Sequence, residues 1–532
     1  MKKLLVLIVA IMCMIFATIL NGQNDQFERK PTSIGNKAKY EIVGKKTPIR
    51  THEYKLISPR KIKKSGRLSN QKMNEETFFT DSLKDVLMVK LKRKIELENG
   101  PKPKSNESDA QNIQPKASYE INIGAGSPPD NTLAVSENGF IVAADNNQIG
   151  FYDESGNTLD EFSYPDFLSE FDAGIGANTS DPKVVYDPED DRFIFFIQSG
   201  SQSNVSFIIL GFSSSDDPRD DWHFHSFTDH RDGERWFDYP SLAVNNTEVF
   251  VSGNLFDDEG DFQGNCIYQF GKDDGYAGSE VTVGLFWQDI TPDWHIFPIG
   301  GLYAVPSATS THYGPGIYLI STKSKGGGDV YLFEITDRHD SEPELRKYSI
   351  NIDDYEVAPS AAQNGTAERL DAGDCRIKGA FYLRGRITFV FAKDDGHSFS
   401  GIAVTRIRIR DFFLIQKFFH NEQNGDYCYP SIAHRSQSRN NFKTLMVFLK
   451  SSNDVFPQVR MQTMRGRTLS RIGHSTRIQS GESFRDDGER GVARWGDYIS
   501  VQRKYGTRTA WALAHTADEN NLWRSHLIKI DL

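Results

Sequence analysis

A short phrase that returns along the chain constrains the fold more than any other feature of this sequence. Its clear copies are Ser127–Val135, Ser180–Tyr186, Asp238–Val244, Asp426–Ala433 and Trp495–Val501, with weaker ones at Phe297–Gly300 and Gly373–Ile377. Measured on Asp130, Asp181, Asp238, Pro298, Asp374, Asp426 and Asp497, the steps are 51, 57, 60, 76, 52 and 71 residues. A unit repeated at this spacing indicates a repeat architecture.

Each unit contains several short apolar runs separated by polar turns. The second unit has Val184–Tyr186, the turn Asp187–Asp191, then Phe193–Ile197 and Val205–Phe212. Runs of this kind predict strands, and a series of them predicts an all-β fold. Three or four antiparallel strands per unit, repeated around a ring, describe a β-propeller. We predict seven blades, with six and eight as alternatives because the fourth and fifth units are faint. A helical solenoid is excluded by the absence of helical apolar spacing.

The first 22 residues have the pattern of an export signal. Lys2 and Lys3 precede an apolar run from Leu4 to Leu20, followed by polar and small residues. We therefore predict a signal peptide over 1–22 and a secreted, periplasmic or cell-surface protein with no membrane span after signal removal. An uncleaved membrane anchor is the alternative, because the apolar run is long for a signal. The mean hydropathy of −0.52 excludes a polytopic membrane protein.

Residues 23–118 differ in charge from the rest of the chain. Through residue 118 there are 24 Lys and Arg against 12 Asp and Glu, a charge of +12, whereas the remainder has 38 against 60, a charge of −22. Apolar spacing predicts one amphipathic helix between Asn74 and Leu97, and 99–118 has the composition of a linker. We expect a spacer whose helix docks on the acidic propeller over 119–532, with a basic arm for an anionic surface as the alternative. The acidic body argues against nucleic acid as a partner.

The start of each repeat supplies the candidate ligand-binding residues. In a propeller the first strand of each blade lines the central channel, so the leading side chains gather at one mouth. We predict a ligand site made by Arg235, Asp238, Arg376, Tyr429, Arg494 and Asp497. Guanidinium groups bind carboxylate or sulfate bidentately, and aromatic faces stack on sugar rings. The alternative is that the recurring Asp residues only cap turns or join blades by accepting backbone hydrogen bonds.

The repeats and one turn resemble the sialidase-like propellers, which include hydrolases, polysaccharide lyases and binding modules. The turn is Ala392–Phe399, which keeps the Asp-x-Gly-x-Ser-aromatic order of the Asp-box, a structural turn in that group. Pro128–Asp130, Asp181–Pro182 and Arg494–Tyr498 further resemble, over 119–532, a set of large secreted bacterial propeller proteins of unassigned activity. The substrate-arginine motif of sialidases has only a faint echo at Cys375–Lys378, without its Pro. Tyr429 and Tyr498 stand at the correct end of their strands for a Tyr nucleophile, but no motif assigns a catalytic residue.

We predict no cofactor and no metal site, with two alternatives weighed. His223 and His225 lie on one face of a predicted strand, a geometry that zinc can use, but no third ligand is placed. The acidic turn Asp257–Asp261 offers oxygen ligands for calcium, although it does not match an EF-hand loop. Solvated acidic turns are the preferred interpretation.

After signal removal three cysteines remain. Cys375 and Cys428 occupy equivalent places in consecutive units, so a disulfide between them is as plausible as two separate buried thiols.

Together these observations predict an exported β-propeller that binds a glycan, a protein or a cell-surface ligand at its channel mouth. The expected partners are a polysaccharide, a glycoconjugate or a surface protein. The alternative is a glycan-active enzyme of the sialidase-like group, a hydrolase or lyase acting on anionic sugars. Whether the chain is catalytic stays open at this point.

Overall fold

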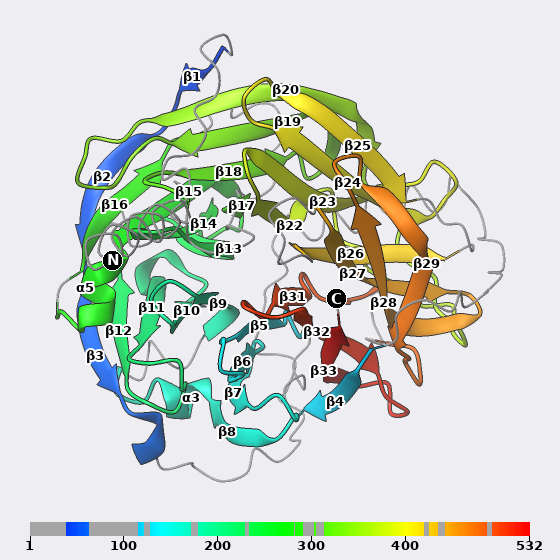
Figure 1. Cartoon of the computed structure of the whole chain (residues 1–532), viewed down its shortest axis with the longest axis horizontal. Helices are drawn as coiled ribbons and strands as arrows, with labels where there is room; N and C mark the ends of the chain where they lie inside the picture. Colours follow the sequence, from blue (N-terminus) through cyan, green and yellow to red (C-terminus); the bar gives the residue numbers. More distant parts are fainter. Residues whose placement is uncertain are drawn as a thin grey trace, which may run out of the picture.

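The computed structural model describes residues 39–62, 115–121, 128–171, 179–228, 234–280, 282–290, 303–304, 313–419, 425–434, 442–486 and 492–531. Within these residues, seven antiparallel sheets of four or five strands stand as blades around a common axis (Figure 1). The innermost strands of neighbouring blades contact one another all the way round the ring. The predictions of an all-β fold and of a seven-bladed propeller are confirmed.

Three blades consist of four strands that follow one another along the chain. Blade 1 contains β5 (Thr132–Val135), β6 (Ile141–Ala144), β7 (Gln148–Tyr152) and β8 (Thr158–Ser163). Blade 5 contains β22 (Ile377–Tyr382), β23 (Arg386–Asp394), β24 (Ser400–Arg408) and β25 (Phe413–Phe419). Blade 6 contains β26 (Asp426–His434), β27 (Thr444–Ser452), β28 (Val455–Arg465) and β29 (Ser470–Gln479). In each of these blades the first strand is innermost and the fourth forms the outer edge.

Three further blades have four strands of their own and a fifth from the N-terminal segment. Blade 2 contains β9 (Thr179–Asp187), β10 (Arg192–Ser199), β11 (Phe207–Ser213) and β12 (Trp222–Phe227). Blade 3 contains β13 (Trp236–Val244), β14 (Glu248–Phe256), β15 (Phe262–Gly271) and β16 (Val283–Gln288). Blade 4 contains β17 (Tyr303–Ala304), β18 (Ile317–Thr322), β19 (Gly326–Ile335) and β20 (Leu345–Glu356).

The fifth strands form a strap around the outside of the ring. β1 (Glu41–Ile42) pairs with β20, β2 (Lys45–Arg50) with β16 and β3 (Glu53–Ile57) with β12 (Figure 1). Outer edge strands expose unpaired backbone groups, and the strap satisfies them on three blades. The sequence analysis did not assign strands to this part of the basic segment, and the helix that it predicts between Asn74 and Leu97 lies outside the described residues.

The two ends of the propeller domain close the ring. Blade 7 contains β31 (Ser500–Arg503), β32 (Thr509–Ala517) and β33 (Trp523–Asp531), and its outer strand is β4 (Ala117–Ile121). β4 is antiparallel to β33, with Tyr119 opposite Leu527. Blade 7 therefore contains strands from both ends of the domain. Because the chain continues from β4 into blade 1, the ladder of hydrogen bonds between β4 and β33 joins the start of the domain to its last blade.

The remaining described elements are short. They are α3 (Tyr164–Phe167), α5 (Lys272–Ala277), the 3-10 turns Pro59–Lys61 and Ser203–Val205, and the parallel pair β21 (Arg369–Leu370) and β30 (Val492–Ala493). Within the described ranges no helix is both long enough and apolar enough to cross a membrane.

The continuous apolar runs of the inner strands follow from packing on both faces of each blade. In β10, Phe193, Phe195 and Ile197 belong to the apolar cluster shared with blade 1. Ile194 and Phe196 belong to the cluster shared with blade 3. Successive side chains of a strand point to opposite faces, so a blade between two neighbours buries every residue of such a run. Each fully buried aromatic or aliphatic side chain contributes about 1.5–3 kcal/mol.

The three cysteines of the described propeller are buried thiols and form no disulfide. Cys375 packs in the core shared by blades 4 and 5, whereas Cys428 packs in the core shared by blades 6 and 7. The two residues therefore belong to different seams, and the proposed Cys375–Cys428 bridge is not formed.

Candidate functional site

The recurring phrase of the sequence forms a β-bulge at the start of the innermost strands. In β9, Lys183 pairs with Phe196 and Ser180 with Gln198, so Asp181 and Pro182 stand opposite a single residue. Proline has no backbone N–H for the ladder, and a bulge is one of the few places in a sheet that accept it. The same register shift recurs at Tyr239–Pro240 in β13 and at Tyr429–Pro430 in β26.

The residue that begins each of these three bulges has a left-handed backbone, and so does Asp130, at the matching place just before β5. The φ angles are 44° at Asp130, 54° at Asp181, 59° at Tyr239 and 47° at Tyr429. This region is unfavourable for residues other than glycine, and such strained residues cluster at binding and catalytic sites. Here the strain recurs in four blades at the same place, around one mouth of the channel.

The bulge sets two layers of side chains in the channel. The upper layer, the mouth ring, consists of Asp130, Asp181, Tyr239, Arg376, Tyr429 and Tyr498. The lower layer, two residues further along each strand, consists of Thr132, Lys183, Ser241, Lys378, Ser431 and Ser500, and all six line the channel cavity. Six blades thus contribute the same pair of positions.

On one side of the mouth, a guanidinium group is fixed between a carboxylate and an aromatic ring. Arg376 Nε donates to Asp374 Oδ2 at 2.7 Å and to Oδ1 at 2.9 Å. The Cζ atom of Arg376 lies 3.7 Å from the ring centroid of Tyr239, and Lys378 Nζ donates to Tyr239 Oη at 2.6 Å. Arg376 is buried, and burial alone would lower its pKa. The Asp374 carboxylate outweighs this effect, so the pKa of Arg376 lies well above its ordinary value.

On the other side, Lys183 and Tyr498 face a group of carboxylates. Lys183 Nζ lies 2.9 Å from the ring centroid of Tyr498. Arg494 Nη2 forms an ion pair with Asp497 Oδ2 at 3.0 Å. The backbone N–H of Asp497 donates to Asp130 Oδ1 at 2.5 Å. The ring centroids of Tyr498 and Tyr239 are 5.3 Å apart, which joins the two sides of the mouth.

Burial moves the pKa values of Asp130, Lys183 and Asp181 toward neutral pH. It raises the pKa of Asp130 to about 6, with the Asp497 carboxylate as the second cause. It lowers the pKa of Lys183 to about 8, although three neighbouring carboxylates act in the opposite direction. It raises the pKa of Asp181 well above its usual range, helped by the charges of Asp238 and Asp130. Shifts of this kind mark candidate acid–base or ligand-binding groups.

Two polar atoms of the mouth ring have no hydrogen-bond partner among the described residues. They are Nη1 of Arg376 and the hydroxyl of Tyr498, and both atoms are buried. A buried donor without an acceptor costs about 1–3 kcal/mol, so folded proteins rarely keep one without a compensating role. Both groups are donors and are suited to an acceptor supplied from outside the protein.

A cavity of about 150 Å³ lies below the mouth ring. Its described lining includes the cations Lys183, Lys378 and Arg503 and no carboxylate. Hydroxyl groups of Thr132, Ser241, Ser431, Ser500 and four tyrosines complete the polar part of the lining. The aspartates therefore stand at the rim of the mouth, whereas the interior favours an anion or a hydrogen-bond acceptor.

Five of the six ligand residues predicted from the sequence belong to this mouth. Asp238, Arg376, Tyr429, Arg494 and Asp497 come together there: Asp238 accepts from Gln198 Nε2 at 3.2 Å, and the Tyr429 ring lies 5.4 Å from Lys378 Nζ.

Arg235 lies apart from the other predicted residues. Its Nη2 donates to Gln288 Oε1 at 2.9 Å, at the end of β16, three strands from the innermost strand of that blade. Arg235 lies four residues before the bulge, directly ahead of β13, and its side chain points away from the channel toward Gln288. Of the six predicted residues, it is the one that the structure places away from the channel mouth.

Some of the recurring aspartates join blades. Asp426 is fully buried and accepts hydrogen bonds from the backbone N–H groups of Ala362 and Ser400, both at 2.9 Å. For Asp426 the scaffold interpretation therefore fits. The predicted ligand-binding set left out Lys183, Lys378 and Tyr239, and it left out Tyr498, which was noted only for its place at the end of a strand. The constant distance of these residues from the Asp or Tyr of the phrase was a usable signal.

The histidine pair and the acidic turn have partners within the protein. His223 Nδ1 bonds with Tyr54 Oη at 2.9 Å and His225 Nδ1 with Thr51 Oγ1 at 3.2 Å, which attaches the strap to blade 2. Asp258 accepts from the backbone N–H of Ser203 at 2.7 Å. In the part of the chain that the structure describes, no three His, Cys, Asp or Glu side chains form a group that could hold a metal ion.

Comparisons with known proteins give only distant similarities. No family model matches the chain, and no curated protein matches it. Among solved structures, a chain of a mitotic checkpoint complex is 9% identical, with 81% of this chain and 96% of that chain covered and a TM-score of 0.42. A sialidase of Trypanosoma rangeli is 10% identical, with 77% and 59% covered and a TM-score of 0.36. An α-L-arabinanase of Penicillium chrysogenum is 11% identical, with 78% and 98% covered and a TM-score of 0.36.

These similarities are too low to assign a site or a substrate. The expectation of a sialidase-like propeller is confirmed for the propeller architecture. The Asp-box echo also forms a structural turn: Asp395 Oδ1 accepts from the backbone N–H groups of His397 and Phe399, at 2.6 and 3.1 Å, between β23 and β24.

Proposed function

We propose that the channel mouth binds a sugar that carries a carboxylate or sulfate group. The single observation that supports this most is the cavity below the mouth ring, whose described lining has three cations and many hydroxyl groups but no carboxylate. We further propose that the protein is exported and meets this ligand outside the cytoplasm. No cofactor is part of the proposal.

The chemistry of the mouth fits the two parts of such a ligand. Lys183, Lys378 and Tyr498 line the cavity, and the buried donors of Arg376 and Tyr498 have no partner among the described residues, so an acidic group of the ligand can accept from them. Charge-assisted hydrogen bonds from guanidinium and ammonium groups to an anion are roughly twice as strong as neutral ones. The carboxylates around the rim accept hydrogen bonds from sugar hydroxyl groups, and the tyrosine rings pack against ring C–H groups. The cavity of about 150 Å³ accommodates an acidic substituent or one small ring, not an oligosaccharide.

A binding experiment with matched sugars tests the proposal. Galacturonate and glucose 6-sulfate, with glucose as the uncharged control, are titrated into the full chain and into K378M. We expect the charged sugars to bind more tightly than glucose and K378M to weaken them about tenfold or more, the equivalent of one charge-assisted hydrogen bond. Lys393 is half-buried on β23 of the same blade and donates to a backbone oxygen, so K393M is the matched control. Equal affinity for glucose and galacturonate, or unchanged binding by K378M, would refute the proposal.

A second candidate is a glycan-active enzyme, and one observation favours it. Asp130 and Lys183 have pKa values displaced to about 6 and about 8, on either side of neutral pH. A base and an acid with these values support proton transfer near pH 7, which both hydrolases and lyases of acidic sugars require. In this function Asp130 would remove a proton, Lys183 would return one, and Arg376 with Lys378 would neutralise the acid group.

The two functions differ in turnover. Uronate-containing and sulfated polysaccharides are incubated with the protein, and reducing ends and unsaturated uronate products are measured. An enzyme releases product with a bell-shaped pH profile that has its maximum near 7, and D130N abolishes release while K393M does not. A binding protein releases none, but its affinity for galacturonate still falls in K378M.

A further inference from the structure

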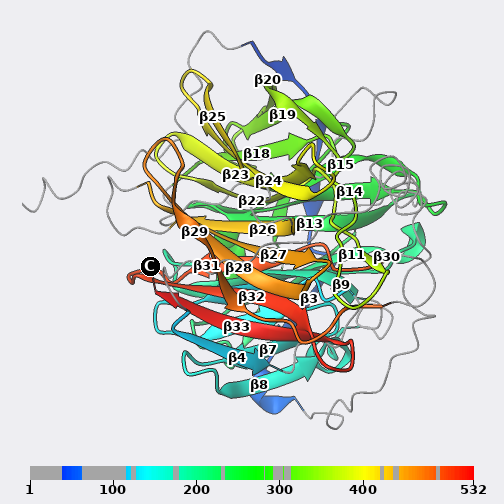
Figure 2. The same cartoon turned by 90° about the vertical axis from the view of Figure 1, so that its right-hand side faces the viewer.

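A group of arginines lies on the face of the propeller opposite the mouth. The inner strands begin at the mouth, so the hairpins that follow them reach the far face; Figure 2 shows β30, near the mouth, and the C-terminus on opposite sides of the molecule. Arg386 begins β23 directly after such a hairpin, Arg408 ends β24, and Arg467 follows the end of β28. Blades 5 and 6 thus bring arginines from distant parts of the chain to one rim.

Three of these guanidinium groups surround a single aromatic ring. The Cζ atoms of Arg386, Arg467 and Arg406 lie 5.0, 5.6 and 5.8 Å from the ring centroid of Phe442. Phe442 is itself buried between the blades. The ring fixes the spacing of the three cations through cation–π contacts, each worth about 0.5–2 kcal/mol.

Among the described residues, no carboxylate forms an ion pair with these three cations; the nearby Asp411 pairs with Arg408 and Arg410. Arg406 is buried, and it donates only to neutral oxygens, those of Thr388, Gly466 and Thr444, at 2.8–3.2 Å. Arg386 Nη1 donates to a backbone oxygen at 3.2 Å. Burial and then the charge of Arg386 lower the pKa of Arg406 to about 10. Burial, followed by the charges of Arg467, Arg408 and Arg410, lowers the pKa of Arg386 against the opposing effect of Asp411. The fold therefore holds like charges together against their mutual repulsion.

The group continues outward along β24 and β25. Arg408 pairs bidentately with Asp411, and Arg410 lies 3.5 Å from the same carboxylate. The Arg410 side chain is 67% exposed, and Phe413, beside Arg408, is 55% exposed. Five guanidinium groups and one carboxylate leave a local charge of +4 on a propeller whose overall charge is negative.

We propose that this arginine rim, made of Arg386, Arg406, Arg408, Arg410 and Arg467 with Phe413, is a second binding surface for a polyanionic sugar chain. Guanidinium forks match sulfate and carboxylate groups spaced along such a chain, and exposed aromatic faces pack against its sugar rings. Arg406 is a positioning residue that holds the other guanidinium groups around Phe442. The rim lies on the face opposite the mouth, so this proposal does not depend on the one for the mouth.

A lipid surface is the less suitable partner. Membrane-surface binding requires several apolar side chains that enter the lipid beside the basic ones. Of the large apolar residues that are exposed in the described structure, only Phe413 belongs to the rim. Anionic vesicles therefore form one arm of the test.

The test compares rim variants with a matched arginine on the same face. Arg338 follows β19 of blade 4, on the same face as the rim. Among the described carboxylates, only Asp340 lies within ion-pair distance of it. R338Q therefore removes one arginine charge from a neighbouring blade without changing the rim. Dextran sulfate, polygalacturonate, uncharged dextran and phosphatidylglycerol vesicles are titrated into wild type, R386Q/R467Q, R338Q and K378Q. Unfolding midpoints verify that each variant is folded. Should R386Q/R467Q fail to fold, R410Q/R467Q, which changes two exposed side chains, replaces it.

We expect both polyanions to bind wild type, dextran not to bind, and the rim double variant to lose at least tenfold in affinity while R338Q stays within twofold. We expect K378Q, which changes the mouth, to retain the polyanion binding that the rim provides. We expect R386Q/R467Q, which changes the rim, to bind galacturonate at the mouth as tightly as wild type does. The rim proposal fails if R386Q/R467Q binds dextran sulfate like wild type, or if vesicles bind more tightly than either polysaccharide. In those cases the sugar titrations at the mouth still decide the first proposal independently.

Discussion

The backbone N–H of Asp497 donates to the buried carboxylate of Asp130 across the seam between the last and the first blade, at 2.5 Å. The two residues are 367 positions apart in the chain. Asn146 Nδ2 donates to the other oxygen of Asp130 at 2.9 Å. One carboxylate thus joins the ends of the ring and forms part of the rim of the proposed ligand site.

This carboxylate should make stability depend on pH. Burial raises the pKa of Asp130 in the folded protein to about 6, from 3.8 when it is free. Between these values the folded state keeps a proton that the unfolded chain has released, so the unfolding free energy falls as pH rises from 4 to 6. D130N cannot ionise and lacks this loss. We expect the unfolding free energy of D130N minus that of wild type to rise by up to about 3 kcal/mol between pH 4 and pH 7.

Urea denaturation at half-unit steps of pH measures this difference. The substitution also removes a hydrogen bond from Asn146, but that effect is the same at every pH and only offsets the whole curve. A difference that stays constant from pH 4 to pH 7 would show that Asp130 is not protonated in this range.

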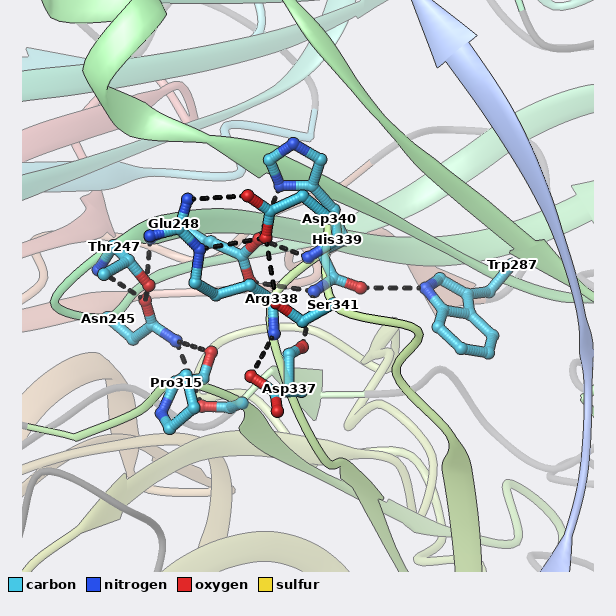
Figure 3. A network of polar contacts seen from close by, with 12 residues as sticks. Asn245, Thr247, Glu248, Trp287, Pro315, Asp337, Arg338, His339, Asp340 and Ser341 are labelled. Carbon is cyan, nitrogen blue, oxygen red and sulfur yellow. Dashed lines mark hydrogen bonds and ion pairs between the residues drawn. The ribbon is translucent and has the colours of Figure 1, made fainter.

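A second pair links blades 3 and 4, and its contribution to stability also falls as pH rises, but in a higher pH range than that of Asp130. His339 Nδ1 lies 2.7 Å from Glu248 Oε1, and the backbone N–H of His339 donates to the same oxygen at 2.7 Å (Figure 3). The hydrogen bond with Glu248 raises the pKa of His339. Stability from this pair is therefore fully present below the unfolded pKa of 6.5 and is lost as pH rises through the folded value. We expect H339Q to lower the unfolding free energy by about 1–2 kcal/mol at pH 6 and by much less at pH 9.

Thermal unfolding of wild type and H339Q at pH 6 and pH 9 tests this expectation. His474, which is exposed on β29 of a different blade, provides H474Q as the control. An H339Q penalty that is equal at both pH values would mean that the imidazole is not charged in the folded protein.

The Asp-box turn should matter for stability and not for binding. Asp395 is buried and accepts two backbone hydrogen bonds, whereas its neighbour Asp394 is more exposed and accepts one from Gly396 at 2.8 Å. D395A leaves two backbone donors without their acceptor, so we expect a loss of about 1–3 kcal/mol, against less than 1 kcal/mol for D394A. Chemical denaturation measures both values. Weaker sugar binding by a folded D395A would contradict the purely structural role of this turn.

The seven-bladed architecture could be predicted from the sequence because each blade repeats the same pattern of a turn followed by an apolar strand. Asp181–Pro182 and Tyr239–Pro240 mark the same bulge, and the runs after them mark the inner strands, so the spacing of the phrase gives the number of blades. The strap was not predicted, because Lys45–Arg50 has no long apolar run. Its stability comes from pairing with β16, an edge whose position only the assembled ring defines.

The site was predicted in part for a similar reason. Arg376, Arg494 and Asp497 lie next to the repeated phrase, and proximity along the chain places them at the mouth. Arg235 is equally close in sequence, but its side chain turns outward to Gln288. The position two residues after the bulge carries Lys183 and Lys378 in two blades and serine or threonine in four others. That inward layer becomes apparent only when the bulges are superimposed, because the residue types at this position differ.

The hydroxyl of Tyr498 offers the sharpest separation of function from stability. It is buried without a partner among the described residues, whereas Tyr429, also in the mouth ring, donates to the backbone oxygen of Asp371 at 3.2 Å. Removing an unsatisfied buried hydroxyl relieves a desolvation cost, so we expect Y498F to be about 1 kcal/mol more stable than wild type and Y429F to be about 1 kcal/mol less stable. Phenylalanine keeps the ring under Lys183, and the cation–π contact is therefore retained.

If the mouth binds an acidic sugar, the same substitution should weaken binding. A ligand acceptor that pairs with the Tyr498 hydroxyl loses one hydrogen bond in Y498F, and we expect the dissociation constant for galacturonate to rise about threefold to tenfold. Calorimetric titration of both variants, beside their denaturation curves, gives the two quantities on the same preparations. Lower stability of Y498F would indicate a partner for the hydroxyl within the protein, and stronger stability with unchanged galacturonate binding would place the ligand elsewhere. Gain of stability with loss of affinity is the combination that only a binding role for this hydroxyl produces.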